Sequence, residues 1–154
     1  MVLIGRNVEK LETVQAEIQE DGGNADFAAL DIRGESDVER VVSEIIARHG
    51  PVSALVNNAG GQFPSPLEKI SQNGWEAVVQ TNLTGGFLMS RELFKQCMKE
   101  HGGAIVNIVA DMFGGMAMMG HSGAARAGMV NFTESAAVEW ASSGVRVNAV
   151  APGW

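Results

Sequence analysis

Short apolar runs alternate with longer amphipathic segments along most of the chain. The apolar runs, which predict strands, are residues 2–4, 26–32, 54–56, 104–109 and 145–150. Between them, apolar residues recur every three or four positions, which is the spacing of one face of a helix. The helices predicted from this spacing are residues 8–20, 36–49, 73–99 and 122–141.

Two local signals refine these elements. Ser36-Asp37-Val38-Glu39 has the capping-box pattern, in which Ser caps a helix start and Glu follows three residues later. Gly85 and Gly86 lie in the middle of the long helical pattern, where each costs about 1 kcal/mol relative to alanine. Close packing or the approach of a ligand would explain this pair of glycines.

Apolar strands that alternate with amphipathic helices are typical of a parallel sheet with right-handed crossovers and helices on both faces. The sequence therefore predicts an α/β, doubly wound parallel sheet in a single domain over residues 1–154. Such sheets bind ligands at the carboxyl ends of their strands. The loops expected at that edge are residues 5–7, 31–33, 57–61, 109–120 and 151–154.

Composition excludes several classes of protein. Hydrophobic residues make up 45% of the 154, which suits a folded domain with a sizeable core. Cys97 is the only cysteine, so disulfide scaffolds and Cys-based zinc sites are excluded, and no metal site is expected. The formal charge of -7 opposes binding to nucleic acid. No apolar run approaches the roughly 20 residues that span a bilayer, so we expect a cytoplasmic protein without a membrane partner.

Several motifs resemble those of the short-chain dehydrogenase/reductase family. Asn57 to Gly60 matches the family's Asn-Asn-Ala-Gly turn, Thr81 to Gly85 its active-site asparagine segment, and Val147 to Gly153 its late strand and cofactor loop. More narrowly, Asn57 to Phe63, Met98 to Gly103 and His121 to Gly128 resemble the branch of peroxisomal trans-2-enoyl-CoA reductase and related bacterial acyl-CoA reductases or terpenoid alcohol dehydrogenases.

The resemblance implies a Rossmann-like dinucleotide-binding domain that is incomplete. Family members begin with a strand and a Gly-rich turn that binds the pyrophosphate, and the chain has no counterpart to either. The substrate-binding helices and the final strand that the family has after Pro152-Gly153 are missing as well, so we expect a chain truncated at both ends. The family's missing strand lies between residues 2–4 and 54–56, so we expect residues 2–4 and 26–32 to stay unpaired with the other strands. Unpaired inner edges are costly, so the chain alone should be marginal or aggregate, whereas the complete protein should be a homo-oligomer.

The resemblance also implies an NADP site. Arg6 would accommodate the 2′-phosphate of NADP, or is a solvated charge at a strand end. Asp31 would reach the adenine amino group with Ile32 beside the ring, or is a turn carboxylate. Asn58-Ala59-Gly60 would provide a flat surface for the cofactor, or is an ordinary turn. Pro152-Gly153 would hold the nicotinamide amide, or is a plain loop.

The family's usual catalytic residues are largely replaced. The chain contains no tyrosine, and Ser122 and Arg126 stand where the family has the catalytic Tyr and Lys. Val109 or Ala110 stands at the serine position, and only Asn82 matches. Because a serine hydroxyl cannot act as general acid near neutral pH, ordinary carbonyl reduction would lose roughly 10²–10⁴-fold in rate. Arg126 cannot give up a proton, but it can orient ribose or stabilise an oxyanion.

Conjugate reduction makes smaller demands on these residues. Hydride goes to the β carbon of an enoyl thioester, and a hydrogen-bond donor at the thioester oxygen stabilises the enolate. Asn82, Ser122 and His121 can all donate there. His121 is also the candidate proton source, or else a partly exposed residue at a helix start. Asp111 could pair with His121, or is a carboxylate at a strand end.

The sequence therefore predicts an NADP-dependent oxidoreductase that reduces the double bond of a trans-2-enoyl-CoA thioester. One alternative is an alcohol or carbonyl dehydrogenase that acts on a terpenoid or similar substrate. Another is a catalytically silent fragment or partner-binding module, because the Gly-rich turn and the tyrosine are both absent.

Overall fold

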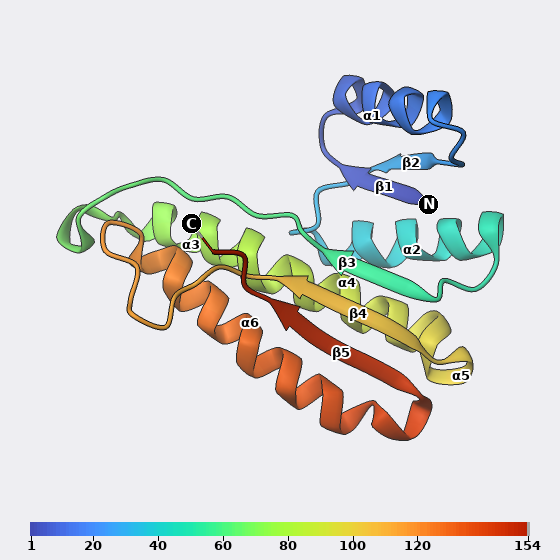
Figure 1. Ribbon diagram of the computed structural model, residues 1–154. Coiled ribbons are helices and arrows are strands. Elements are labelled where there is room, and N and C mark those ends of the chain that lie inside the picture. Colours follow the sequence, from blue (N-terminus) through green and yellow to red (C-terminus); the bar gives the residue numbers. More distant parts are fainter. Residues whose placement is uncertain (154) are drawn as a thin grey trace.

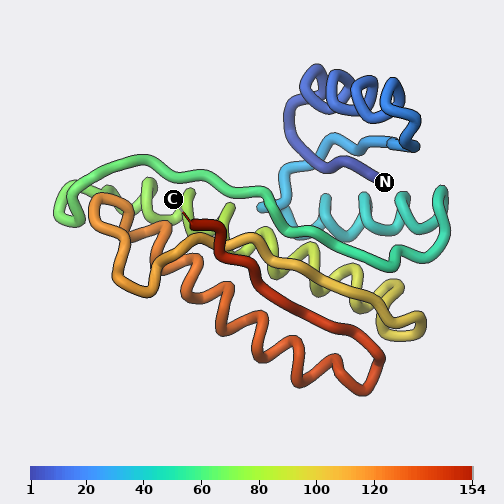
Figure 2. Tube along the Cα trace, in the orientation of Figure 1, coloured from blue at the N-terminus to red at the C-terminus, as the bar shows by residue number. Residues whose placement is uncertain are grey.

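The computed structural model describes residues 1–153. Trp154, the last residue of the expected loop 151–154, lies outside the described residues. The elements are β1 (Val2–Gly5), α1 (Val8–Glu20), β2 (Asp26–Ala29), α2 (Glu35–His49), β3 (Ala54–Asn57), α3 (Gln72–Val79), α4 (Gly85–Leu93), α5 (Lys99–His101), β4 (Gly103–Ile108), α6 (Gly120–Glu139) and β5 (Val145–Val150). Figure 1 shows their arrangement, and Figure 2 shows the path of the chain.

The strands form two parallel sheets. β1 pairs with β2, and β3, β4 and β5 form a second sheet in that order. The arrowheads of all five strands point to the same side of the molecule (Figure 1). The fold class is therefore the expected α/β arrangement, and the expected separation of the first two strands from the other three is confirmed.

One hydrophobic core joins the two sheets. Ile4 of β1, Ala28 of β2 and Leu55 of β3 pack against the same cluster, which consists of Leu30 and buried residues of α2 and α4. α1 contacts β1 and β2, and Figure 1 shows it on the side of these strands away from α2. Helices therefore hold the strand pair in place although its backbone bonds to no other strand among residues 1–153.

A second core lies between α6 and the three-stranded sheet. Ile105 of β4 and Val145 and Val147 of β5 pack with Met98 and Ala136. Successive side chains of a strand point to opposite faces of its sheet, and the two faces of this sheet differ in how far they are covered. Val56 of β3 remains 60% exposed on the face opposite these helices.

The start of α2 and the end of β2 differ from expectation. The expected capping box is wrong: the cap of α2 is Gly34, and Ser36 lies inside the first turn. The strand expected at 26–32 ends at Ala29. Its end follows from a turn at Asp31, whose carboxylate accepts a hydrogen bond from the Arg33 backbone N–H.

The long helical pattern forms a helical run from Gln72 to His101 with two π-helical turns, Gln80–Thr84 and Phe94–Met98. Gly85 and Gly86 follow the first of these turns. A Cβ atom at Gly85 would lie 2.5 Å from Ile32 Cδ1, and one at Gly86 would lie 2.6 Å from Met129 Cε. Close packing of neighbouring elements therefore explains both glycines.

A membrane-crossing segment is not found: among the described residues, no helix combines the necessary length with the necessary apolar character.

Candidate functional site

Four of the expected cofactor-binding positions follow strand ends. Arg6 comes directly after β1, Asp31 two residues after β2, Asn58 directly after β3 and Pro152 two residues after β5. Because all five strands run in the same direction (Figure 1), these positions lie along one edge of the molecule. That edge is where parallel α/β sheets bind their ligands.

The end of β2 carries a tightly paired carboxylate. The Arg33 side chain donates from Nε to both carboxylate oxygens of Asp31, at 2.9 and 3.1 Å. This hydrogen bonding lowers the pKa of Asp31 to about 2, and the positive charge of Arg6 contributes in the same direction. Ile32 packs against Gly85 and the core below it. The edge at β1 and β2 thus has the exposed guanidinium group of Arg6 near a carboxylate whose charge is paired with Arg33, and an exposed guanidinium group suits a phosphate.

Asn82 connects the loop after β3 to the helical run. Its Oδ1 accepts a hydrogen bond from the Gly61 backbone N–H, and its Nδ2 donates to the Gly61 carbonyl, each at 2.8 Å. The side chain is buried within the first π-helical turn. A Cβ atom at Gly60 would lie 2.8 Å from Asn82 Oδ1, so this loop approaches Asn82 more closely than a side chain would allow.

Ser122 and Arg126 lie one turn apart on α6 and contact each other. The Ser122 hydroxyl donates to Gln62 Oε1 at 2.7 Å and accepts from Arg126 Nε at 3.2 Å. Arg126 Nη1 also donates to the carbonyl of Ile108 at 3.3 Å, at the carboxyl end of β4. Burial lowers the pKa of Arg126 from its ordinary value. Gln62 therefore connects the loop after β3 to the start of α6.

His121 lies at the start of α6, as expected, but it is completely buried, so the alternative of a partly exposed residue is wrong. Its ring lies edge-on to Phe63, with centroids 4.5 Å apart. Neither ring nitrogen has a hydrogen-bond partner among residues 1–153. Asp111 accepts from the Phe113 backbone N–H at 3.4 Å and behaves as a strand-end carboxylate.

A buried polar network anchors the loop from below. Asn57 Nδ2 donates to Asn107 Oδ1 at 2.8 Å and to Ser90 Oγ at 2.9 Å. Asn107 Nδ2 in turn donates to Thr133 Oγ1 at 2.8 Å. These bonds connect β3, β4, α4 and α6 directly beneath the point where the loop leaves the sheet. Buried, satisfied networks of this kind restrict the packing of the elements they join.

Three consecutive loop residues thus contact three of the expected catalytic residues. Gly61 binds Asn82, Gln62 binds Ser122, and Phe63 contacts His121. The sequence pattern did not assign a role to Gln62 or Phe63. The only signal at the level of sequence was their position inside the motif from Asn57 to Phe63.

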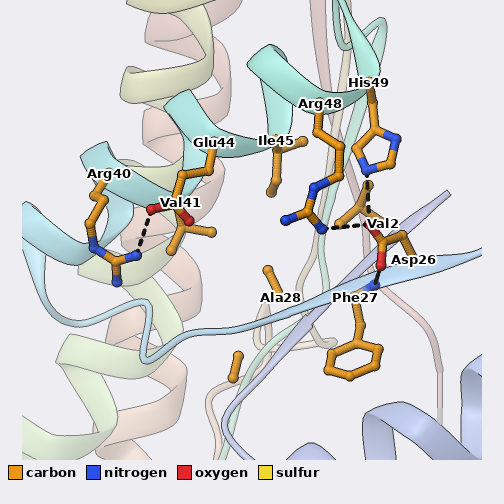
Figure 3. Close-up of a pocket in the computed structure, with 11 residues that line it drawn as sticks. Val2, Asp26, Phe27, Ala28, Arg40, Val41, Glu44, Ile45, Arg48 and His49 are labelled. Atoms are coloured by element: carbon orange, nitrogen blue, oxygen red, sulfur yellow. Dashed lines mark hydrogen bonds and ion pairs between the residues drawn. The ribbon is translucent and has the colours of Figure 1, made fainter.

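A separate pocket of about 190 Å³ lies between β2 and α2 (Figure 3). Asp26 accepts a hydrogen bond from Arg48 there and contacts His49. These contacts, chiefly the one with Arg48, lower the pKa of Asp26. The pocket extends along the whole of β2, and Asp26 is the first residue of that strand, so the Asp26 cluster lies at the opposite end of the strand from the candidate site. Within residues 1–153, no group of three or more His, Cys, Asp or Glu is placed to hold a metal ion.

Comparison with known proteins identifies relatives over the whole chain. The family model described as short chain dehydrogenase matches residues 1–154. A probable 2,4-dienoyl-CoA reductase of Bacillus subtilis (strain 168) is 38% identical over 99% of this chain and 61% of its own length. A peroxisomal 2,4-dienoyl-CoA reductase of Danio rerio is 36% identical over 99% of this chain and 51% of its own length.

A solved structure is also similar in both sequence and fold. The citronellol catabolism dehydrogenase of Pseudomonas aeruginosa PAO1 is 60% identical, with a TM-score of 0.96 over 99% of this chain and 63% of that chain. The chain thus spans between half and two thirds of the length of these relatives. The family model, these relatives and the parallel α/β fold agree, and the chain belongs to the short-chain dehydrogenase family.

Proposed function

We propose that this chain forms the cofactor-binding part of an NADP-dependent reductase that acts on the double bond of a trans-2-enoyl-CoA thioester. The observation that carries the proposal is the assembly of Asn82, Ser122 and Arg126 by one loop at the carboxyl edge, in a chain without tyrosine. Such a site offers hydrogen-bond donors and a cation, but no phenol to transfer a proton.

NADP would lie along the edge formed by the strand ends. Arg6 would bind the 2′-phosphate, because Arg6 is exposed and the negative charge of the nearby Asp31 is already paired with Arg33. Asp31 and Ile32 would lie near the adenine, Asn58-Ala59-Gly60 along the cofactor, and Pro152-Gly153 at the nicotinamide amide. The reduced cofactor supplies a hydride.

The donor set favours conjugate reduction. When hydride reaches the β carbon of an enoyl thioester, negative charge collects on the thioester oxygen, and preorganised donors stabilise it. Arg126 adds a fixed positive charge beside Ser122. The α carbon then takes a proton in a later step. His121 is our candidate for its source, and its delivery requires Phe63 to move, because Phe63 covers the ring.

A second candidate function is oxidation of a terpenoid or similar alcohol. It is favoured by the 60% identity to the citronellol catabolism dehydrogenase, which exceeds the 38% identity to the probable 2,4-dienoyl-CoA reductase. The missing phenol weighs against it, because alcohol oxidation requires a base that removes the hydroxyl proton. Assays with crotonyl-CoA and NADPH, and with citronellol and NADP, distinguish the two reactions.

The first test is cofactor binding, followed by the fluorescence of NADPH and NADH. We expect NADPH to bind more tightly, and Arg6→Gln to weaken NADPH about tenfold while NADH changes little, because only NADPH presents a 2′-phosphate. Arg146→Gln, which removes an exposed arginine near the start of β5, is the matched control. Absence of binding by either nucleotide would support the silent-module alternative.

A further inference from the structure

The hydroxyl hydrogen of Ser122 is already engaged in a hydrogen bond to another residue. A serine side chain has one donor hydrogen, and Ser122 is completely buried, so that hydrogen needs a protein acceptor. Gln62 Oε1 at 2.7 Å accepts it. The other neighbour, Arg126, has only donors and occupies a lone pair of the hydroxyl oxygen. Ser122 therefore serves to orient Gln62.

The other expected donors are partly engaged or covered. Asn82 Nδ2 gives one of its two hydrogens to the Gly61 carbonyl, and the side chain is buried. Arg126 gives its Nε hydrogen to Ser122 and one Nη1 hydrogen to the carbonyl of Ile108, so its Nη2 group supplies positive charge beside the site. His121 is completely buried against Phe63.

Gln62 itself has a donor group at the protein surface. Gln62 is exposed, whereas Ser122 and Asn82 are buried. Because the carboxamide oxygen is turned toward Ser122, the Nε2 hydrogens lie at the other end of the planar amide. The bond from Arg126 holds Ser122 in the orientation that fixes this amide. The chain of contacts thus presents one oriented N–H donor beside the guanidinium group.

We propose that Gln62 Nε2 is the donor to the thioester oxygen of the substrate, with Ser122 and Arg126 as the residues that orient it. This inference rests on the proposed function, since it names the residue that stabilises the enolate. No bond of the amide breaks: hydride from NADPH forms the C–H bond at the β carbon, and a separate proton completes the α carbon. Gln62 keeps both hydrogens and contributes only electrostatic stabilisation.

The test uses a complex that cannot react. Crotonyl-CoA labelled with ¹³C at the thioester carbonyl is added to the 154-residue chain with oxidised NADP, and infrared spectroscopy follows the labelled carbonyl. A hydrogen bond to the oxygen lowers the stretching frequency. We expect this shift in the wild-type chain. In Gln62→Leu we expect the shift to be lost and the affinity for crotonyl-CoA to fall about tenfold, the scale of one well-placed hydrogen bond.

Further variants separate Gln62 from its neighbours. Gln62→Glu has the same shape without the N–H donors, and should also lose the shift. Gln80→Leu, at another exposed glutamine, should keep both the shift and the affinity. Ser122→Ala should keep a broadened shift, because the donor remains but its orientation is lost.

The outcomes that overturn the proposal are distinct. A shift that persists in Gln62→Leu and Gln62→Glu but disappears in Ser122→Ala would make Ser122 the donor and leave the proposed function intact. Absence of crotonyl-CoA binding to the wild-type chain, with NADP bound, would overturn the enoyl thioester assignment and this inference together.

Discussion

Asn82 shows how one side chain holds the candidate site together. Its amide uses both ends on the backbone of a single loop residue, Gly61, and the side chain is 8% exposed. Removing a buried hydrogen-bonding group leaves its partners without replacements, and this usually costs more than the bond itself contributes. The position of the loop that carries Gln62 therefore depends on Asn82.

We expect Asn82→Ala to lower the free energy of unfolding by about 1–3 kcal/mol, because the Gly61 N–H and carbonyl both lose their partner. Hydrogen exchange of the Gly61 amide should accelerate. Asn82→Asp keeps the acceptor, so the Gly61 amide should exchange more slowly there than in Asn82→Ala. Asn73→Ala, at an exposed position of α3, is the control. Unchanged exchange at Gly61 in Asn82→Ala would contradict this role.

Asp31 offers a prediction about pH. Its pKa is lowered to about 2, below the ordinary 3.8, mainly by the side chain of Arg33. A lowered folded-state pKa means that the pair stabilises the fold above pH 3.8 and that this contribution is lost as the pH falls toward 2. The contribution is small, because about a third of each side chain is exposed.

Arg33→Gln should therefore raise the pKa of Asp31 toward its ordinary value. A titration of the side-chain carboxyl carbon by NMR measures this directly. Arg40→Gln, which removes an arginine paired with other residues of α2, should leave the Asp31 titration where it is. If Asp31 titrates identically with and without Arg33, the ion pair does not form in solution.

At the scale of elements, the helical run from Gln72 to His101 shows how packing outweighs local propensity. Glycine is unfavourable inside a helix, yet Gly85 and Gly86 start α4 directly after a π-helical turn. Neighbouring side chains occupy the space that a Cβ atom would need at both positions. The two neighbours differ in how far they can move.

Gly85→Ala should destabilise the chain by about 1–3 kcal/mol, because three atoms of the β-branched Ile32 lie within 3.3 Å of the new Cβ. Gly86→Ala should change the free energy of unfolding by less than about 1 kcal/mol. There the clash is with Met129 Cε, the end of a flexible side chain, and the gain in helix propensity offsets it. Urea denaturation of both variants measures the difference. Equal destabilisation by the two substitutions would contradict the packing argument.

At the scale of the whole molecule, two sheets share one core without sharing hydrogen bonds. β1 and β3 each pair with one strand only among residues 1–153, so each has an edge with unpaired backbone groups. Such edges pair readily with other chains. Val56 adds an apolar side chain, 60% exposed, to the β3 edge strand.

We expect the isolated chain to be marginally stable and to associate as its concentration rises. Val56→Lys should reduce this association, because a charge on an edge strand opposes pairing with another chain. Val14→Lys, on the exposed side of α1, should have a smaller effect and serves as the matched control. Light scattering during thermal unfolding at several concentrations measures both. A reversible, cooperative melt of soluble monomer would contradict the expectation.

Most of the secondary structure could be predicted from the sequence. The five strands and the main helices lie at the expected positions, because the spacing of apolar residues reflects which face each element buries. The boundaries at Gly34 and Ala29 could not be predicted as well. At both places a local turn sets the boundary, whereas the spacing of apolar residues is compatible with more than one start or end of the element.

The sequence by itself determined the family resemblance, the parallel α/β class and the absence of tyrosine, since these depend on residue identity and order. Only the tertiary structure decided which donors are already used, that His121 is buried and that Gln62 contacts Ser122 across 60 positions of the chain. The physical reason is that a hydrogen bond depends on distance and direction between side chains far apart in sequence, which the pattern along one chain does not contain.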